Sequence, residues 1–356
     1  MSVSQKVTKL NSKPTIIRQG HLAEKIVIVD GFPGCGKTLF SPIVAAMDRV
    51  ELLIHPFEIE FVCRLFHFQK LEEDAAIAMV RMFTDHKLYQ TMMGRETNFR
   101  YSDISSVFND SNPWRYFKRI FQEGDMIIPE RIKKERPILS LTTHDLLSMS
   151  KPVFDALDDR LIFIEIVRHP LYMVIQQTLN MERIFSGNPR DIQIYIKHGD
   201  KQLPYFAYQW KDLFVESNNV EKTIYSMNYC SKLTESFKNN YNKVINGKIL
   251  TIPFERFVLD PWPYTEQIKE MLGSEVTRKT IKSINKQNVP RKKISDGIPL
   301  AIYKRCGWDP PVEGLTERGE LDKRRQFAID QGANKDAIKV LDQMSAKYEE
   351  TYGLWF

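Results

Sequence analysis

The feature that most constrains the fold of this chain is a glycine-rich segment, Gly31-Phe32-Pro33-Gly34-Cys35-Gly36-Lys37-Thr38. It follows the apolar run 25–30 and opens a helical pattern, which is the strand, turn and helix setting that the phosphate-loop pattern Gly-x-x-x-x-Gly-Lys-Thr requires. The glycines permit a tight turn whose N–H groups point into one concavity. The helix N-terminus and Lys37 add positive charge there. We therefore expect 33–38 to bind a phosphate or a similar oxyanion; the alternative is a glycine-rich turn without a ligand.

Short apolar runs alternate with helical patterns along the chain, as is typical of buried parallel strands and their crossover helices. The predicted strands are 25–30, 125–129, 137–143, 161–168 and 247–254. The predicted helices are 71–93, 171–179, 206–214, 264–272 and 334–352. This alternation predicts a three-layer α/β sandwich with a central parallel β-sheet. We expect 288–319 to be loop, and we expect the polar stretch 218–246 to be an insertion over the site.

Composition places few limits on the ligand. The 356 residues are 42% hydrophobic and 27% charged, which is typical of a globular protein with a substantial core. The net charge of +6 suits an anionic ligand but is too small to indicate nucleic acid as a partner. The four cysteines are scattered without metal-site spacing, which argues against zinc and fits a reducing compartment.

The N-terminal residues predict neither a signal peptide nor a membrane anchor, because 1–19 are polar and contain lysines. No apolar run approaches the roughly 20 residues that a membrane span needs. We expect a cytoplasmic protein with a flexible tail over 1–24. Residues 25–356 are expected to form one α/β domain with loop insertions and a C-terminal helix.

Three polar positions follow or flank the predicted strands. Arg168 ends one strand, where ligands of α/β sheets bind, and its guanidinium can bind a phosphate through two hydrogen bonds. His144 follows another strand and could accept a proton from an attacking hydroxyl. The basic pair Arg291-Lys292 lies in a loop that could close over a phosphate. The alternatives are an arginine paired with a local carboxylate, a structural histidine and a solvated basic face.

Together, these segments resemble the sulfotransferases that use 3′-phosphoadenosine 5′-phosphosulfate (PAPS). Residues 32–38 lie in register with that family's 5′-phosphosulfate loop, Tyr-Pro-Lys-Ser-Gly-Thr-Thr, and 168–170 resemble its Arg-x-Pro start to the 3′-phosphate site. Thr143-His144 resembles the Thr-His of Lys-Thr-His-Leu-Pro in the cytosolic branch, and Arg291-Lys292 resembles an Arg-Lys-Gly loop. Residues 254–261 resemble Tyr-Glu-Asp-Leu-x-x-Asp-Pro, so the resemblance runs from about residue 25 to 300.

The chain departs from the family pattern at several positions. Gly34 stands where the family loop has lysine, and Lys37 appears three residues later. Gln176 stands where a serine is expected eight residues after the strand-end arginine. Thr142 replaces the lysine before Thr-His, and Lys293 replaces the glycine after Arg-Lys.

The resemblance implies a P-loop, sulfotransferase-like fold with PAPS as co-substrate. The 5′-phosphosulfate would bind Pro33, Gly34, Cys35, Gly36, Lys37 and Thr38. The 3′-phosphate would bind Arg168, Gln176, Arg291 and Lys292. His144 would be the catalytic base, and Lys37 would stabilise the charge that grows on the leaving group. No metal is expected, because a sulfuryl group carries less charge than a phosphoryl group.

Several alternatives stay open. A glutamate after the loop helix, Glu51, Glu58 or Glu60, could be the base in place of His144. The loop also fits a kinase or NTPase that uses Mg-ATP or Mg-GTP, with Thr38 on the metal ion, although no apolar strand ends in the Asp that usually holds it. A non-catalytic nucleotide-binding relative, with the aromatic-rich end 348–356 as a docking segment, is a third possibility.

The acceptor cannot be read from the sequence beyond a small molecule or a carbohydrate with a hydroxyl or amine. Segments 57–69, 95–121 and 180–208 mix aromatic residues with arginine and are expected to build its pocket. The sequence is silent on the oligomeric state.

Overall fold

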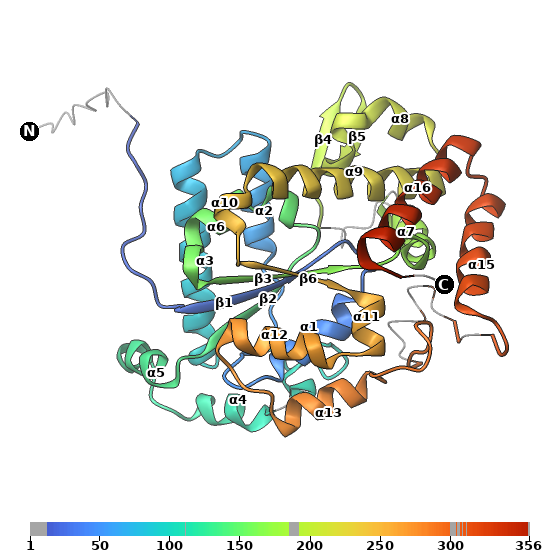
Figure 1. Cartoon of the computed structure of the whole chain (residues 1–356). Coiled ribbons are helices and arrows are strands. Elements are labelled where there is room, and N and C mark those ends of the chain that lie inside the picture. The colour runs from blue at the N-terminus through green and yellow to red at the C-terminus, as the bar shows by residue number, and fades with distance from the viewer. Residues whose placement is uncertain are drawn as a thin grey trace, which may run out of the picture.

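The computed structural model of the chain describes residues 13–110, 112–184, 192–299, 304, 307, 309–310 and 312–354. A four-stranded parallel sheet in the order β2-β1-β3-β6 lies at its centre. Helices cover both faces of this sheet (Figure 1), so the predicted α/β sandwich is confirmed. The strands are β1 (Lys25–Asp30), β2 (Ile138–Thr142), β3 (Leu161–Val167), β4 (Tyr195–His198), β5 (Lys201–Pro204) and β6 (Ile249–Pro253).

The helices of the described residues vary from a single turn to six turns. They are α1 (Lys37–Ala45), α2 (Phe57–His67), α3 (Glu73–Met92), α4 (Pro113–Ile120), α5 (Ile128–Glu135), α6 (Lys151–Leu157), α7 (Pro170–Ile184), α8 (Lys211–Glu216), α9 (Asn219–Asn240), α10 (Asn242–Ile245), α11 (Phe254–Leu259), α12 (Trp262–Leu272), α13 (Arg278–Lys286), α15 (Glu317–Asp330) and α16 (Lys335–Tyr352).

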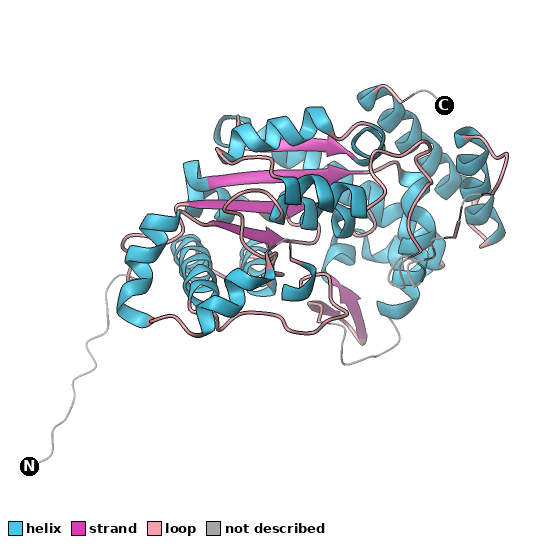
Figure 2. Ribbon diagram, turned by 90° about the horizontal axis from the view of Figure 1, so that it is seen from below, coloured by secondary structure: helices cyan, strands magenta, loops and turns pink. Residues whose placement is uncertain are grey.

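The sheet is buried on both faces, which explains why its strands read as continuous apolar runs. On one face, Val27 and Val29 of β1 belong to a core cluster with Phe40 of α1. On the other face, Ile26 and Ile28 belong to a second cluster with side chains of α2, α3 and α6. Figure 2 shows the four strands side by side, with the β4–β5 hairpin set apart from them.

Parallel strands place their carboxyl ends at one edge of the sheet. At this edge β1 leads into the Gly31 loop, β2 into His144, β3 into Arg168 and β6 into Phe254. The fold therefore gathers segments that are more than 200 residues apart in the sequence, as ligand sites of open α/β sheets require.

One predicted strand is wrong in type, and one predicted loop ends three residues early. Residues 125–129 form a 3₁₀ turn, Asp125–Ile127, and the start of α5 rather than a strand. Pro129 explains the difference, because proline lacks the N–H that a central strand donates but fits the first turn of a helix. The expected loop over 288–319 ends at Thr316, whose side chain caps the unpredicted helix α15.

Two other segments differ in detail, and the helix after the glycine-rich loop contains a proline. Residues 206–214 divide into a 3₁₀ turn, Tyr205–Trp210, and the start of α8. The polar stretch 218–246 forms α9 and α10, and α9 packs against α7 and α16 as part of the helical layer. Pro42 stays inside α1, which continues to Ala45.

The N-terminal segment is tied to α3 over the part that the structure describes. Residues 13–24 contain no helix or strand, and 1–12 lie outside the described residues. The Asp85 carboxylate accepts hydrogen bonds from Arg18 and from the backbone N–H groups of Leu22 and Ala23. None of the described helices combines the length and hydropathy that crossing a membrane requires.

A buried carboxylate fixes the edge of the sheet. Asp30, at the end of β1, accepts hydrogen bonds from the Thr143 hydroxyl at 2.8 Å, from Leu147 N–H at 3.0 Å and from Leu146 N–H at 3.0 and 3.1 Å. Gly31 O accepts a further bond of 3.1 Å from Asp145 N–H. The turn after β2 is therefore bound to the strand end that precedes the glycine-rich loop.

Replacing Asp30 with alanine is expected to lower the free energy of unfolding by about 3 kcal/mol, because buried N–H groups would lose their acceptor. Denaturant unfolding of Asp30→Ala measures this. Asp30→Asn is the matched control, since it keeps one acceptor oxygen and should lose less. A loss below about 1 kcal/mol in Asp30→Ala would contradict this role for the carboxylate.

Candidate functional site

A cavity of about 300 Å³ lies at the carboxyl edge of the sheet. It contains every predicted site residue except Cys35 and Lys292. Among its described lining residues there are four permanent cations and no carboxylate. The cavity is lined by Pro33, Gly34, Gly36, Lys37, Thr38, Leu39, His144, Arg168, Tyr172, Ile175, Gln176, Phe254, Arg291, Ile294, Ser295, Gly297, Gly307 and Arg324.

The loop needs glycine at two of its positions for steric reasons. Gly36 has φ 106° at the N-terminus of α1, and a Cβ there would lie 2.3 Å from the Phe254 ring. Gly31 has φ 149°, and a Cβ there would lie 2.3 Å from Ile166 O. Any side chain at either position would displace the loop, so the glycines set both its shape and its distance from the neighbouring strands.

Lys37 lies within the loop rather than in solvent. Its ammonium donates hydrogen bonds to Gly31 O and, at 3.3 Å, to Phe32 O, and it lies 3.9 Å from Cys35 Sγ. The side chain is buried and faces the same cavity as Thr38. Lys37 therefore supplies a full positive charge at the N-terminus of α1, where the helix dipole also favours anions.

Arg168 is held between the loop and two aromatic rings. Its Nη1 donates a hydrogen bond of 2.9 Å to Gly34 O, and its guanidinium lies 4.3 Å from the Phe254 ring centroid and 5.4 Å from that of Tyr172. Its Nε is buried without a hydrogen-bond partner among the described residues. Burial lowers the pKa of Arg168, but an arginine remains a cation at neutral pH.

Two further arginines extend this arrangement. Arg291 lies 5.6 Å from the Phe254 ring, on the same ring as Arg168. Arg324 lies 4.9 Å from the Tyr172 ring and also pairs with Glu320 at 2.8 Å. Sequence reasoning missed both Tyr172 and Arg324. The signal for Arg324 was weak, because α15 is charged on most sides and the helix itself was not predicted.

The helix after β3 supports the loop through two glutamines. Gln177 Nε2 donates a hydrogen bond to Pro33 O, and Gln176 lines the cavity. A Cβ on Gly34 would lie 2.9 Å from Gln177 Nε2, so the loop packs closely on α7. Gln177 is thus a support that sequence reasoning missed, while Gln176 lies where the sequence predicted it.

A buried support also lies behind Arg168. The Glu255 carboxylate accepts hydrogen bonds from His169 N–H at 3.0 Å and from the Tyr348 hydroxyl of α16 at 2.6 Å. Burial raises the pKa of Glu255, and the charge of Arg168 opposes that shift. Glu255 thus joins α11, the start of α7 and α16 directly behind the strand-end arginine.

His144 is paired with a buried carboxylate. Its Nδ1 lies 3.0 Å from Glu60 Oε1, which also accepts the His144 backbone N–H at 3.1 Å, while Glu60 Oε2 accepts from Arg64 at 2.8 Å. Burial acts to raise the pKa of Glu60, but hydrogen bonds from His144 and the Arg64 charge outweigh it and lower the pKa. The ionised carboxylate therefore favours a proton on Nδ1 and leaves Nε2 to accept one.

Two rings flank this histidine. The imidazole of His144, 38% exposed, stacks against Phe57 and His55 with centroid distances of 6.0 and 5.7 Å. Burial lowers the pKa of His55, and the neighbouring His144 acts in the same direction. Segment 57–69 thus lies beside His144, and its role in an acceptor pocket stays a prediction.

The other two segments expected to build the acceptor pocket are 95–121 and 180–208. Like segment 57–69, residues 95–121 contribute no side chain to the described cavity lining, and their role in an acceptor pocket stays a prediction. Residues 185–191 of segment 180–208 lie outside the described residues. Of the remainder, the Tyr205 ring lies 4.5 Å from the Arg64 guanidinium.

The alternative glutamates are engaged elsewhere. Glu51 is buried and accepts hydrogen bonds of 2.8 and 2.9 Å from Arg119. Glu58 pairs with Lys87 at 3.0 Å. Among the three glutamates considered as bases, Glu60 has contact with His144, and the geometry makes it a partner of that histidine.

Cys35 and Lys292 lie apart from the cavity. Lys292 is exposed to solvent. The Cys35 thiol is buried and lines a separate cavity of about 560 Å³ together with Asp145 and Cys230. Burial raises the pKa of Cys35, so its side chain is a neutral thiol and only its backbone can serve the loop.

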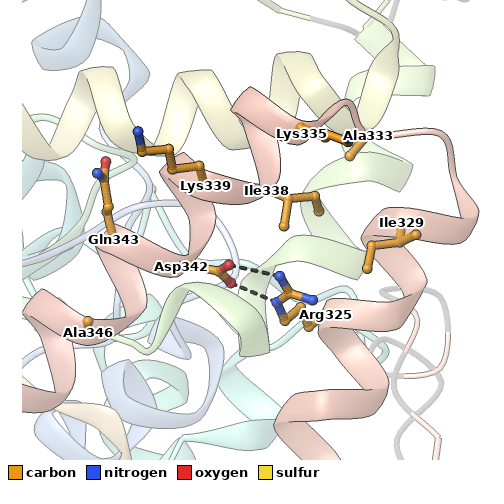
Figure 3. Close-up of a pocket in the computed structure, with 9 residues that line it drawn as sticks. All are labelled: Arg325, Ile329, Ala333, Lys335, Ile338, Lys339, Asp342, Gln343 and Ala346. Atoms are coloured by element: carbon orange, nitrogen blue, oxygen red, sulfur yellow. Dashed lines mark hydrogen bonds and ion pairs between the residues drawn. The ribbon is translucent and has the colours of Figure 1, made fainter.

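A larger groove, of about 720 Å³, lies between α15 and α16 and contains none of the predicted residues (Figure 3). In it the Arg325 guanidinium donates two hydrogen bonds of 2.8 Å to the Asp342 carboxylate. Both side chains are partly exposed, so the pair adds little stability but fixes the two helices relative to each other. No group of three or more His, Cys, Asp or Glu side chains in the described part of the chain could hold a metal ion.

Comparisons with known proteins give only distant similarity. Neither a protein-family model nor a curated protein sequence matches the chain. Solved structures that match include the sulfotransferase domain of the Synechococcus PCC 7002 olefin synthase, at 11% identity and a TM-score of 0.41, covering 89% of this chain and 98% of that one. Mouse sulfotransferase SULT7A1 complexed with PAP matches at 13% identity and a TM-score of 0.36, covering 90% and 89%.

A sulfotransferase from Mycobacterium avium matches at 13% identity and a TM-score of 0.40, covering 92% of this chain and 77% of that one. Because these TM-scores lie below 0.5, the likeness by itself is no argument for a shared activity. The residues around the cavity must carry any functional assignment.

The carboxyl of Asp145 is expected to make stability depend on pH. Burial, together with the charge of Asp30, raises its pKa to about 7 from the ordinary value of 3.8 for an aspartate. Between these values the native state holds a proton that the unfolded state has released, so the free energy of unfolding falls as pH rises through this window. Above pH 7 the native state bears the full free-energy cost of burying the ionised Asp145 carboxylate.

Asp145→Asn is expected to remove this penalty. It should be more stable than the wild type at pH 8, by the order of 2 kcal/mol, and similar to it near pH 4. Asn tolerates the left-handed backbone of this residue, φ 51°. Denaturant unfolding of both proteins from pH 4 to 8 measures the difference, and parallel curves would contradict the raised pKa.

Proposed function

We propose that this protein is a sulfotransferase that moves a sulfuryl group from PAPS to a hydroxyl or amine of a small-molecule or carbohydrate acceptor. The observation that carries the proposal is one cavity that joins a glycine-rich loop, three arginines and a carboxylate-supported histidine. The described lining contains cations for phosphate and sulfate groups but no carboxylate.

The donor would bind across the cavity through its two anionic ends. The amides of 33–38 and Lys37 suit the 5′-phosphosulfate, because they combine a helix N-terminus with a full positive charge. The arginines at 168, 291 and 324 suit the 3′-phosphate, because guanidinium groups bind phosphate oxygens in pairs. The Phe254 and Tyr172 rings, which already contact these arginines, give the cavity apolar walls.

The transfer would break one bond and form one. The acceptor oxygen or nitrogen attacks sulfur, and its new bond to sulfur replaces the bond to the bridging oxygen of the phosphosulfate, which leaves with the electron pair. His144 Nε2 takes the acceptor proton, and the Glu60 carboxylate stabilises the resulting imidazolium. Lys37 and the loop amides stabilise the negative charge on the departing phosphate oxygen.

A kinase or NTPase reaction is the second candidate, since the loop also fits the Mg-nucleotide pattern and Thr38 faces the cavity. The polar lining favours PAPS, because nucleotide-bound Mg²⁺ is usually held with help from a carboxylate. Asp30 cannot serve here without losing its bonds to the turn after β2.

Ligand-induced thermal shifts test the donor. Adenosine 3′,5′-bisphosphate at 100 times its dissociation constant should raise the melting temperature by roughly 3 °C, and Mg-ATP should raise it less. Arg324→Gln should weaken the response to the bisphosphate, because one phosphate ligand is lost. Lys292→Gln is the matched control, since this exposed residue lies outside the cavity. Stabilisation by Mg-ATP alone would refute the proposal and favour the kinase.

His144→Ala should lower kcat roughly 100-fold or more and leave the donor's dissociation constant nearly unchanged. Glu60→Gln should cause a smaller loss and shift the pH–rate profile, because the neutral amide no longer stabilises the imidazolium. His86→Ala, at an exposed histidine of α3, is the control. Rate assays with a panel of phenols, sugars and amines measure kcat, and unchanged turnover in His144→Ala would remove this residue from the mechanism.

A further inference from the structure

A cluster of apolar side chains protrudes from the chain between α3 and α5, away from the cavity described above. Within this segment Tyr101 is 79% exposed, Trp114 72%, Phe121 88% and Met126 89%. The cluster, here named the aromatic surface, consists of Phe99, Tyr101, Phe108, Trp114, Ile120, Phe121 and Met126. Exposed apolar residues gathered in this way mark an interaction site more often than scattered ones do.

The rings of the aromatic surface rest on one another. Phe117 lies 5.7 Å from Trp114, 6.0 Å from Phe108 and 5.6 Å from Phe99 between ring centroids. Phe108 also lies 5.9 Å from Tyr101. Contacts of this kind join four of these residues, Phe99, Tyr101, Phe108 and Trp114, into one surface. The exposed Ile120, Phe121 and Met126 follow along the chain.

A buried network holds this surface in place. Tyr116 packs with Leu52 and Val107 beneath Phe117, and its hydroxyl accepts a hydrogen bond of 2.6 Å from Leu52 N–H. Arg119, on the same helix, donates two hydrogen bonds to Glu51. The protruding rings are therefore presented by an anchored helix, and their exposure is not a consequence of a poorly packed segment.

A basic helix lies beside the aromatic surface. The sequence of α13 contains four exposed cations, Arg278, Lys279, Lys282 and Lys286, and no acidic residue. Lys286 Nζ donates a hydrogen bond of 3.4 Å to Asn109 Oδ1, in the segment that bears the rings. In Figure 1, α4, α5 and α13 lie along the lower edge of the molecule, so the basic helix lies on the same side as the helix that carries Trp114.

We propose that this side of the protein binds the surface of an anionic lipid bilayer. Tyr, Trp and Phe favour the boundary between headgroups and acyl chains, and lysine and arginine near that surface attract acidic lipids. Side chains that stand almost fully clear of their own protein can enter a fluid bilayer without matching pockets. A rigid protein partner would need a complementary pocket for each of them. This association does not depend on the proposed activity.

Vesicle co-sedimentation tests the inference. The full chain should bind phosphatidylcholine vesicles that contain phosphatidylserine at about 0.1 M salt and bind pure phosphatidylcholine much more weakly. The double variant Trp114→Ala/Phe121→Ala should weaken binding roughly tenfold or more. Lys279→Gln/Lys282→Gln should weaken it on acidic vesicles and reduce its salt dependence.

Leu213→Ala is the control, because this side chain is 43% exposed and belongs to α8, which Figure 1 shows at the top of the molecule, opposite α4, α5 and α13. It should bind vesicles as the wild type does. Melting temperatures should be unchanged in all variants, since each replaced side chain is exposed, and Met126→Ala alone provides a milder test if the double variant unfolds. No binding to acidic vesicles, or equal binding by the ring variants, would overturn the inference. Self-association that the double variant abolishes, without vesicle binding, would instead assign this face to a second copy of the chain.

Discussion

The carboxylate of Asp30 is the interaction on which the geometry of the site depends. It ends β1 just before the glycine-rich loop, and it accepts hydrogen bonds from the turn that carries His144. The glycine-rich loop and the proposed base are therefore fixed relative to each other by buried bonds of 2.8 to 3.1 Å. Because unsatisfied buried N–H groups are costly, the carboxylate cannot easily be replaced or recruited for another role.

The cavity is positively charged, and the surrounding side chains hold its cations in fixed positions. Three arginines lie against the Phe254 and Tyr172 rings, and each guanidinium is also held by hydrogen bonds to other parts of the protein. Fixed cations of this kind stabilise charge without reorganising when it develops, which is how sites for phosphate and sulfate transfer lower barriers. The same cavity would suit a substrate with anions at both ends and an uncharged middle.

The part of the fold that could be predicted from sequence is the part set by local patterns. The β1–loop–α1 unit was predictable because glycines, lysine and an apolar run lie within about 20 residues, and β2, β3 and β6 were predictable because both faces of the sheet are buried. The strand predicted over 125–129 was wrong because the prediction relied on the apolar residues of this run and gave too little weight to Pro129, which occupies the first turn of α5.

The parts of the site that could not be predicted depend on tertiary contacts. Glu60 and His144 are 84 residues apart, and only the packing of α2 beside the end of β2 brings them within 3.0 Å. Arg324 lies on a helix without a clear apolar face, so neither the helix nor its role in the cavity could be read from periodicity. Lys292 illustrates a further limit of short motifs, since the basic run predicts a ligand contact for both of its residues, while the structure lines the cavity with Arg291 and exposes Lys292 to solvent.

The contact between Tyr348 and Glu255 has a consequence for the order in which the protein is made. During synthesis, the loop, the sheet and Arg168 all emerge from the ribosome before α15 and α16. Glu255 can accept the hydrogen bond from the Tyr348 hydroxyl only after α16 has been synthesised, and Arg324 can line the cavity only after α15 has been synthesised. A nascent chain with its complete sheet would therefore still lack a finished cavity. The addition of α15 and α16 would couple the assembly of that cavity to the end of folding rather than to its beginning.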